Sequence, residues 1–329
     1  MLKNNKEPLF SIVTPMYNSF NLMEKYFESL ASQSLHNFQI IIVDDSSTDD
    51  SYSKAKEFAD KSGMNIILTK TPNNQGPGFA RNIGINLAVG EWILFIDNDD
   101  WVSADLLEKM DNIICSDSEI NCILFDYMMT DSAGDVTASK TMYKGNRGYI
   151  SVEDAISYTR NHTFGKVYRL DCLKKDNILF PEIRRCEDVG FVARALASCK
   201  KIYYCNEPLY YYFQRNNSLS NNTNIDETPM IQAFRVLEES LGEGYSDSLM
   251  QKSITDLLYG VLLIMCKNKK DRESIIAYID DYCTRYHGWE KCEIIKCIGK
   301  AKRLFLYCAK HHQVLLMKIY ARAHTALIG

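Results

Sequence analysis

The stretch Trp92-Ile93-Leu94-Phe95-Ile96-Asp97-Asn98-Asp99-Asp100-Trp101 decides the fold. Its first five residues form an unbroken apolar run, which is typical of a strand buried on both faces inside a parallel sheet. Three carboxylates follow directly. In open α/β sheets, ligands bind beyond the carboxyl ends of the strands, because helices cover both faces. The stretch therefore predicts an interior strand that carries acidic side chains to a ligand-binding edge.

The acidic end of this stretch has two interpretations. Neighbouring carboxylates raise one another's pKa unless a cation compensates, and Mg²⁺ is typically held by one or two carboxylates together with substrate phosphates. A divalent cation carrying a phosphorylated ligand would explain the cluster. The same residues are also typical of a turn before a helix, here at residues 105–116 with Ser103 as its cap. The motif alone does not choose between these interpretations.

The composition is that of an ordinary soluble globular protein. Of the 329 residues, 46% are hydrophobic and 24% are charged, and the net charge of -4 argues against nucleic acid as a partner. The eleven cysteines include no Cys-x-x-Cys pair, which argues against a disulfide framework or a zinc site and favours a reducing, cytoplasmic location. We expect no signal peptide. The longest apolar run, residues 257–266, is shorter than the ~20 residues that a membrane span needs.

Strand and helix patterns alternate four times over the first hundred residues. Apolar runs at residues 9–14, 38–43 and 65–69 precede the run at 92–96, with helical patterns between them. Asn21 and Glu24 have the spacing of a capping box at the first helix. Short crossovers of this kind imply a mainly parallel sheet flanked by helices. We therefore expect an α/β fold with a Rossmann-like, nucleotide-binding half.

Polar groups that suit a nucleotide follow these strands. Tyr17 offers an aromatic ring after the first strand, and Asp45 offers a carboxylate after the second that can accept from a base N–H. The loop at residues 73–78 opens a helix whose free N–H groups form an anion site, with Arg81 one turn further along. Taken alone, Tyr17 is better explained by packing and Arg81 by a solvated helix face.

The next hundred residues continue the α/β pattern less regularly. A strand is expected at residues 122–128, a polar hairpin or mobile loop at 131–147 and a strand pair at 202–205 and 208–213. An amphipathic helix begins at Glu187 and Asp188, where the helix dipole alone would also favour acids.

From residue 229 onward, only helical patterns occur. We expect a domain over residues 1–220, with a nucleotide-binding half at about 1–100 and an acceptor half at about 101–220, and an all-helical extension at 221–329. Residues 294–329 contain no Asp or Glu and seven Lys and Arg residues, mixed with apolar ones. This mixture fits peripheral contact with an anionic membrane, and it fits a solvated helical face equally well.

Five motifs resemble, in order and at fitting spacing, those of the family 2 glycosyltransferases. They are Ser11-Ile12-Val13-Thr14-Pro15-Met16-Tyr17-Asn18, Ile42-Val43-Asp44-Asp45-Ser46-Ser47-Thr48-Asp49, Gly78-Phe79-Ala80-Arg81-Asn82, Phe95-Ile96-Asp97-Asn98-Asp99-Asp100 and Glu187-Asp188-Val189-Gly190-Phe191. The resemblance covers about residues 10–213. It implies the A-type glycosyltransferase fold and transfer of a sugar from a nucleotide diphosphate sugar, with UDP expected, to an acceptor hydroxyl with inversion. Bacterial cell-surface polysaccharide or glycolipid synthesis is the expected setting.

The resemblance also assigns roles to individual residues. Asp188 matches the catalytic base, and Asp99 together with Asp97 matches the ligands of Mn²⁺ or Mg²⁺. Pro15 and Tyr17 look like the residues that line the uridine. The full set of expected nucleotide-sugar contacts is Pro15, Tyr17, Asn18, Asp45, Arg81, Asp97, Asn98, Asp99 and Lys166. In this scheme Asp45 accepts from uracil N3–H and Arg81 is a cation near the nucleotide.

Three rival functions remain. A phosphatase of the haloacid-dehalogenase type also places Asp-x-Asp after a buried strand, but on the first strand and followed by Thr or Val, whereas here Asp100 follows. A nucleotidyltransferase usually carries a glycine-rich loop with a basic residue on its first strand, and residues 14–19 have neither. The third is a nucleotide-sugar-binding domain without activity. The expected partners are a nucleotide sugar and a saccharide or lipid-linked saccharide acceptor.

Overall fold

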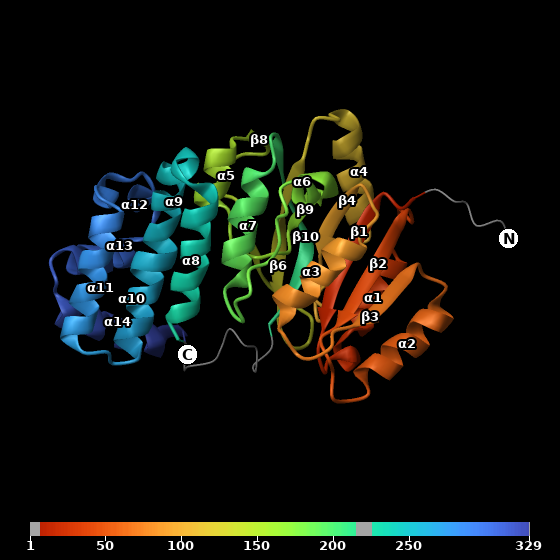
Figure 1. The fold of residues 1–329 in the computed structure, drawn as a ribbon, viewed down its shortest axis with the longest axis horizontal. Coiled ribbons are helices and arrows are strands. Elements are labelled where there is room, and N and C mark those ends of the chain that lie inside the picture. Colours follow the sequence, from red (N-terminus) through yellow and green to blue (C-terminus); the bar gives the residue numbers. More distant parts are fainter. Residues whose placement is uncertain (1–6, 215–225, 329) are drawn as a thin grey trace. The chain divides into compact units, whose positions relative to one another are not determined.

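The computed structural model describes residues 7–214 and 226–328, which fall into two compact units (Figure 1). Unit 1 comprises Met1–Ala155 and Thr159–Ser218, and unit 2 comprises Ile156–Tyr158 and Leu219–Gly329. The domain boundary expected at residue 220 lies outside the described residues. Each unit is described by itself.

Four parallel strands form one half of the ten-stranded sheet of unit 1. In sheet order they are β3 (Ile66–Lys70), β2 (Phe38–Asp44), β1 (Phe10–Met16) and β4 (Trp92–Phe95). β2 and β4 are buried along their whole length, as their continuous apolar sequences predict. Met16 pairs with Asp44, and Val13 with Phe95. The carboxyl ends of β2, β1 and β4 therefore lie side by side at one edge.

Three helices connect these strands: α1 (Glu24–Ala31), α2 (Ser51–Ser62) and α3 (Pro77–Leu87). α3 packs on β1 and β2, and it approaches β1 so closely that a Cβ on Gly84 would come within 2.2 Å of Val13 Cγ1. The capping box expected at the first helix is wrong. A 3₁₀ turn, η1 (Phe20–Leu22), precedes α1, whose N-cap is Met23 without a side-chain bond.

The second half of the sheet is mixed, in the order β4-β9-β6-β10-β5. The strands and helices that follow β4 along the chain are β5 (Trp101–Val102), α4 (Leu106–Ser116), β6 (Cys122–Thr130), β7 (Val136–Lys140), β8 (Gly148–Ile150), α5 (Val152–Tyr158), β9 (Lys166–Arg169), α6 (Leu170–Lys175), α7 (Glu187–Ala197) and β10 (Ile202–Phe213). β9 runs antiparallel to both neighbours, whereas β6 and β10 are parallel. The sheet is thus parallel from β3 to β4 and mixed beyond.

Some local predictions for this half need correction. The strand pair expected at 202–205 and 208–213 is one strand, β10, whose pairing with β6 shifts register around Pro208. Asn206, with φ +55°, lies at this irregularity. Ser103 does not cap α4, because Asp105 holds the N-cap position and the Ser103 hydroxyl bonds its carboxylate. Of residues 131–147, which were expected to form a hairpin or a mobile loop, the part up to Lys140 supplies the turn and second strand of a hairpin, in which β7 pairs with the preceding β6.

Unit 2 is helical throughout the described part of the chain. Its elements from residue 226 onward are α8 (Thr228–Leu241), η3 (Glu243–Tyr245), α9 (Ser246–Ser253), the π-helical η4 (Ile254–Val261), α10 (Leu262–Lys267), α11 (Arg272–Arg285), η5 (Trp289–Lys291), α12 (Ile294–Cys297), α13 (Lys300–Lys310) and α14 (Val314–Ile328). α9, η4 and α10 form one continuous helix, Ser246–Lys267. By length and composition this helix could cross a membrane, but 67% of its most apolar window is buried inside the chain, as in a core helix.

Candidate active site at the carboxyl edge of the sheet

The candidate site lies where β1, β2 and β4 end beside one another. Tyr17 follows β1 with its side chain 45% exposed, and Pro15 is partly buried within the same strand. A half-exposed aromatic side chain at a strand end offers an apolar face with a polar tip. This edge therefore has an aromatic surface next to the acids that follow β2 and β4.

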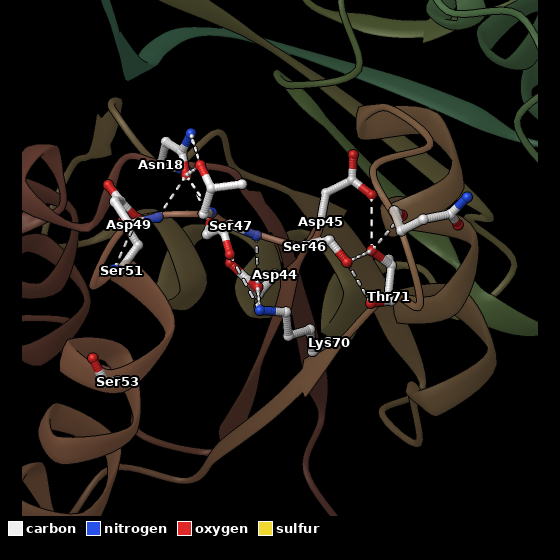
Figure 2. A network of polar contacts seen from close by, with 12 residues as sticks. Asn18, Asp44, Asp45, Ser46, Ser47, Asp49, Ser51, Ser53, Lys70 and Thr71 are labelled. Atoms are coloured by element: carbon white, nitrogen blue, oxygen red, sulfur yellow. Dashed lines mark hydrogen bonds and ion pairs between the residues drawn. The ribbon is translucent and has the colours of Figure 1, made fainter.

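Asn18 holds the loop that follows β2. It adopts φ +48°, in the left-handed region that Asn tolerates better than most residues. Its backbone N–H donates to Ser47 Oγ at 2.9 Å, and its Oδ1 accepts from the backbone N–H of Thr48 at 2.9 Å. Figure 2 shows this cluster beside Asp49. The Asn18 side chain is therefore committed to joining two loops of the edge.

Asp45 is buried at the end of β2 and binds the loop that precedes α3. Its carboxylate accepts from the backbone N–H of Gln75 at 3.0 Å and of Gly76 at 2.7 Å, and from Thr71 Oγ1 at 3.0 Å. Thr71 and Asp45 face each other in Figure 2. A carboxylate has about four lone-pair sites. Asp45 therefore fixes the entry to α3 and keeps room for about one further donor.

Residues 97–100, at the end of β4, form an acidic tip in which each residue is bound differently. Asp100 is fully buried, accepting from Tyr210 Oη at 2.5 Å and from the backbone N–H of Phe213 at 2.7 Å, which ties β4 to β10. Burial raises the pKa of Asp100 well above its usual value, and the nearby Asp99 and Asp97 add to this shift. Asp100 is thus a structural acid.

The other three residues of this tip reach the site in different ways. Asn98 is buried and donates from Nδ2 to Ser19 Oγ, which joins the tip to the segment after β1. Asp97 and Asp99 remain partly exposed, with 28% exposure for the Asp97 side chain. Asp97 and Asp99 are therefore the two acids of the tip that a ligand can reach.

Arg81 bridges the tip to the start of α7. Its Nη2 lies 2.7 Å from Asp97 Oδ1, and its Nη1 lies 3.1 Å from Glu187 Oε1. The guanidinium is only 7% exposed. Burial lowers the pKa of Arg81, but Asp97 and Glu187 outweigh burial and leave the pKa raised. Arg81 was expected near the nucleotide, and the structure places it as a buried link between two acids from distant parts of the chain.

Asp188 occupies the first turn of α7, after Cys186 at the N-cap with φ +61°. Its Oδ1 accepts from the backbone N–H of Val189 at 2.8 Å. Burial and the adjacent Glu187 raise the pKa of Asp188 to about 7, while Arg81 and Lys166 oppose the rise. A carboxyl group with this pKa exchanges protons readily near neutral pH, which suits a general base.

Lys166 is completely buried at the start of β9. Its ammonium donates to the carbonyl oxygens of His162 at 2.5 Å and Phe164 at 3.4 Å. Lys166 was expected to approach the donor. In the structure its ammonium binds backbone carbonyls and acts on Asp188 through its charge.

A family model described as glycosyl transferase family 2 matches residues 11–176, about half of the chain. The chain belongs to this family. The predicted family and α/β fold class, with its helical C-terminal region, are confirmed, and the rival phosphatase and nucleotidyltransferase classes are set aside.

Two curated relatives of this glycosyltransferase act on poly(ribitol phosphate) according to their names. Poly(ribitol-phosphate) β-N-acetylglucosaminyltransferase TarS of Staphylococcus aureus is 28% identical over 73% of this chain and 43% of its own length. Poly(ribitol-phosphate) β-glucosyltransferase of Bacillus spizizenii is 31% identical over 63% of this chain and 32% of its own length. The match thus spans less than half of either relative.

Solved structures support the fold of the glycosyltransferase. The crystal structure of S. aureus TarS residues 1–349 in complex with UDP-GlcNAc has a TM-score of 0.73 and 21% sequence identity. The alignment covers 96% of this chain and 91% of the TarS chain. At this level of identity, the similarity shows a shared fold.

The sequence did not reveal the contacts of two groups in this glycosyltransferase site. Glu187 was visible as an acid beside Asp188, but its position also fitted simple pairing with the helix dipole. Its partner Arg81 lies 106 positions away, so no local pattern links the two. Tyr210, which bonds Asp100 and whose hydroxyl accepts from the backbone N–H of Asp97 at 3.2 Å, carried no signal beyond an aromatic strand.

Proposed function

We propose that this enzyme transfers a sugar from a UDP-sugar to an acceptor hydroxyl with inversion at the anomeric carbon. The observation that carries the proposal is Asp188, a carboxyl group with a pKa of about 7 whose neighbour Glu187 is joined through Arg81 to the acidic tip after β4. The TarS complex with UDP-GlcNAc supports a uridine nucleotide as the donor carrier.

The nucleoside would bind against the ends of β1 and β2. The exposed ring of Tyr17 and the neighbouring Pro15 offer apolar faces for the base. Asp45 has capacity for about one more donor beyond its three bonds within the chain, which suits uracil N3–H. Asn18 and Asn98 would act by holding the loops that carry these groups.

Asp97 and Asp99 would hold a divalent cation, Mn²⁺ or Mg²⁺. Their oxygen ligands suit both ions. Among residues 7–214 and 226–328, no group of three or more His, Cys, Asp and Glu side chains is arranged to hold a metal. The remaining ligands would therefore come from the diphosphate and water, as is common for Mg²⁺. A bound cation would neutralise charge on the departing diphosphate.

Asp188 would act as the general base. The acceptor oxygen forms a bond to the anomeric carbon, the bond from that carbon to the diphosphate oxygen breaks, and the hydroxyl proton passes to the Asp188 carboxylate. A positioned base of this kind contributes ~10²- to 10⁴-fold to the rate. Arg81 and Lys166 limit the rise in the pKa of Asp188, so that the ionised form is populated near neutral pH.

The acceptor would be a saccharide or lipid-linked saccharide of a cell-surface polymer, or a polyol-phosphate polymer of the kind that the relatives' names describe. We place the reaction in the cytoplasm. A lipid-linked acceptor would lie at the membrane surface. The basic helices α13 and α14 expose apolar side chains that suit contact with an anionic membrane: Leu304, Tyr307, Leu315, Leu316 and Ile319.

Turnover of a UDP-sugar tests the proposal. The chain is incubated with UDP-GlcNAc or UDP-glucose, Mn²⁺ and a ribitol-phosphate oligomer, and UDP release is followed. We expect release with at least one donor. Binding of UDP without turnover would indicate the remaining rival, an inactive nucleotide-sugar-binding domain. Absence of calorimetric binding of UDP and of both UDP-sugars would contradict the proposal itself.

A further inference from the structure

A cavity of about 570 Å³ lies along the outer face of α3 in unit 1. Its volume falls within the ~300–1,000 Å³ range of small-molecule sites. Five side-chain amides line it: Asn73, Asn74, Gln75, Asn82 and Asn86. The cavity thus differs from the acidic edge of the sheet in the chemistry of its walls.

The two walls of the cavity are held together by hydrogen bonds. Asn82 on α3 donates from Nδ2 to the carbonyl of Phe180 at 2.9 Å, and its Oδ1 accepts from the backbone N–H of Phe180 at 2.7 Å. Arg184 Nη2 donates to the carbonyl of Asn74 at 3.3 Å. The segment that precedes α7 is therefore fixed to α3 and to the loop before it, and the cavity is formed before any ligand binds.

Four of the five amides are available to a ligand. The side chains of Asn73, Asn74, Gln75 and Asn86 make no hydrogen bond to another residue in the described parts of the chain. Each amide offers two donors and one acceptor oxygen. Vicinal hydroxyl groups of a sugar or polyol also donate and accept, so they match these amides.

The remaining lining favours a neutral ligand. Phe79 is partly exposed and presents a ring face that the C–H groups of a sugar can cover. The charged lining residues Glu182 and Arg184 have opposite signs and leave no net charge. An anion such as a free phosphate would gain little from this balance.

We propose that this cavity binds a neutral polyhydroxylated segment, a saccharide or polyol, of the acceptor chain. The identification as an acceptor segment rests on the proposed transfer function. The backbone N–H of Gln75, on one wall, donates to Asp45 at 3.0 Å. The other wall continues into Glu187 and Asp188, and a Cβ on Gly78 would lie 2.9 Å from Glu187 Cγ. The cavity therefore adjoins both the expected nucleotide site and the base, and would hold a part of the acceptor away from the reacting hydroxyl.

Titration of the full chain with maltoheptaose and with ribitol, followed by NMR, tests the proposal. We expect Asn86→Ala to weaken binding of at least one of them about tenfold, the effect of one lost interaction of ~1.4 kcal/mol. Phe79→Leu, which keeps an apolar side chain but removes the ring, should weaken it in the same direction. The matched control is Asn65→Ala, which removes an exposed amide outside the cavity and should leave binding unchanged.

Several outcomes would overturn the inference. One is that neither probe binds to the native chain. Another is that the native chain and Asn86→Ala bind a probe equally well. The third is that inorganic phosphate displaces the bound probe. UDP binding with Mn²⁺ is measured on the same samples. Unchanged UDP binding together with any of these outcomes contradicts the cavity alone, whereas absent UDP binding contradicts the proposed transfer function.

Discussion

The tips after β2 and β4 are both rich in aspartate, but their carboxylates differ in burial and in hydrogen bonding. Both follow buried parallel strands and both end at the same edge of the sheet. After β2, Asp44 is completely buried and accepts from the backbone N–H of Ser47 at 3.1 Å, while Asp45 is bound by three donors. After β4, Asp100 is fully buried and bound by two donors, whereas Asp97 and Asp99 are partly exposed.

The difference indicates that the exposure of an acid at a strand end, and not its sequence position alone, decides whether a cation can reach it. At the β2 tip, three donors from the chain bind Asp45, and Lys70 Nζ lies 3.6 Å from Asp44 Oδ2 and supplies a positive charge from the chain itself. At the β4 tip, the guanidinium of Arg81 forms ion pairs with both Asp97 and Glu187. The β4 tip is therefore the one that we assign to the cation and diphosphate. The following predictions test that division of roles.

The largest expected effect is that of Asp188→Asn. If the β4 tip serves the diphosphate, the proton must be taken elsewhere, and Asp188 is the group with a suitable pKa. Sugar transfer should fall ~10²- to 10⁴-fold, the contribution of a general base, with UDP affinity nearly unchanged. Steady-state kinetics and calorimetry measure the two quantities. Transfer at the native rate would remove Asp188 from this role.

The pH dependence of transfer should follow the ionisation of Asp188. Because the base acts in its ionised form and its pKa is about 7, the rate should fall about tenfold for each pH unit below 7, or about a hundredfold by pH 5. Glu187→Gln removes a charge that raises the pKa of Asp188, so the midpoint should move to lower pH. A midpoint that does not move in this variant would contradict the coupling.

Tyr210→Phe tests whether Asp100 has a structural role. It removes the hydroxyl that bonds the fully buried Asp100 at 2.5 Å, so the free energy of unfolding should fall by about 1–3 kcal/mol. The control is Tyr211→Phe, since the Tyr211 ring stacks on Trp101 and its hydroxyl makes no bond to the described residues. Equal stability of the two variants in urea denaturation would count against the assignment.

The smallest expected effect is that of Asn18→Gly at the β2 tip. Glycine keeps the positive φ of this position, so the change isolates the side-chain bonds to the loop, worth about 1 kcal/mol. Asn177→Gly, at φ +49° and without side-chain bonds in the described chain, is the matched control. Thermal unfolding should separate the two, and a Tm equal to that of the control would deny Asn18 its role in the loop.

The parallel half of the fold was predictable because its strands are continuous apolar runs. β1, β2 and β4 could be located by hydrophobicity alone, and their common edge followed from right-handed crossovers. β9 was missed because it has four residues and begins with the buried Lys166, which no apolar pattern marks. β10 was divided in two because Pro208 looks like a strand end, although the chain passes it with a shift of register.

In the candidate site, too, local features were predictable and contacts between distant residues were not. Residue types at strand ends indicated where ligands would bind, so Tyr17, Asp45 and the β4 tip were found from local sequence. What each side chain bonds depends on partners that are distant in sequence, such as Arg81 and Glu187 or Asp45 and Gly76. Which acids are exposed to a ligand could therefore be seen only in the structure.

The most direct test of the division between the two tips is the effect of Mn²⁺ on UDP binding, measured by calorimetry for the native chain, Asp99→Asn and Asp45→Asn. We predict that Mn²⁺ strengthens UDP binding to the native chain and to Asp45→Asn, and that Asp99→Asn loses this dependence. Equal UDP affinity of the native chain with and without Mn²⁺, or a dependence that survives in Asp99→Asn and disappears in Asp45→Asn, would contradict the account.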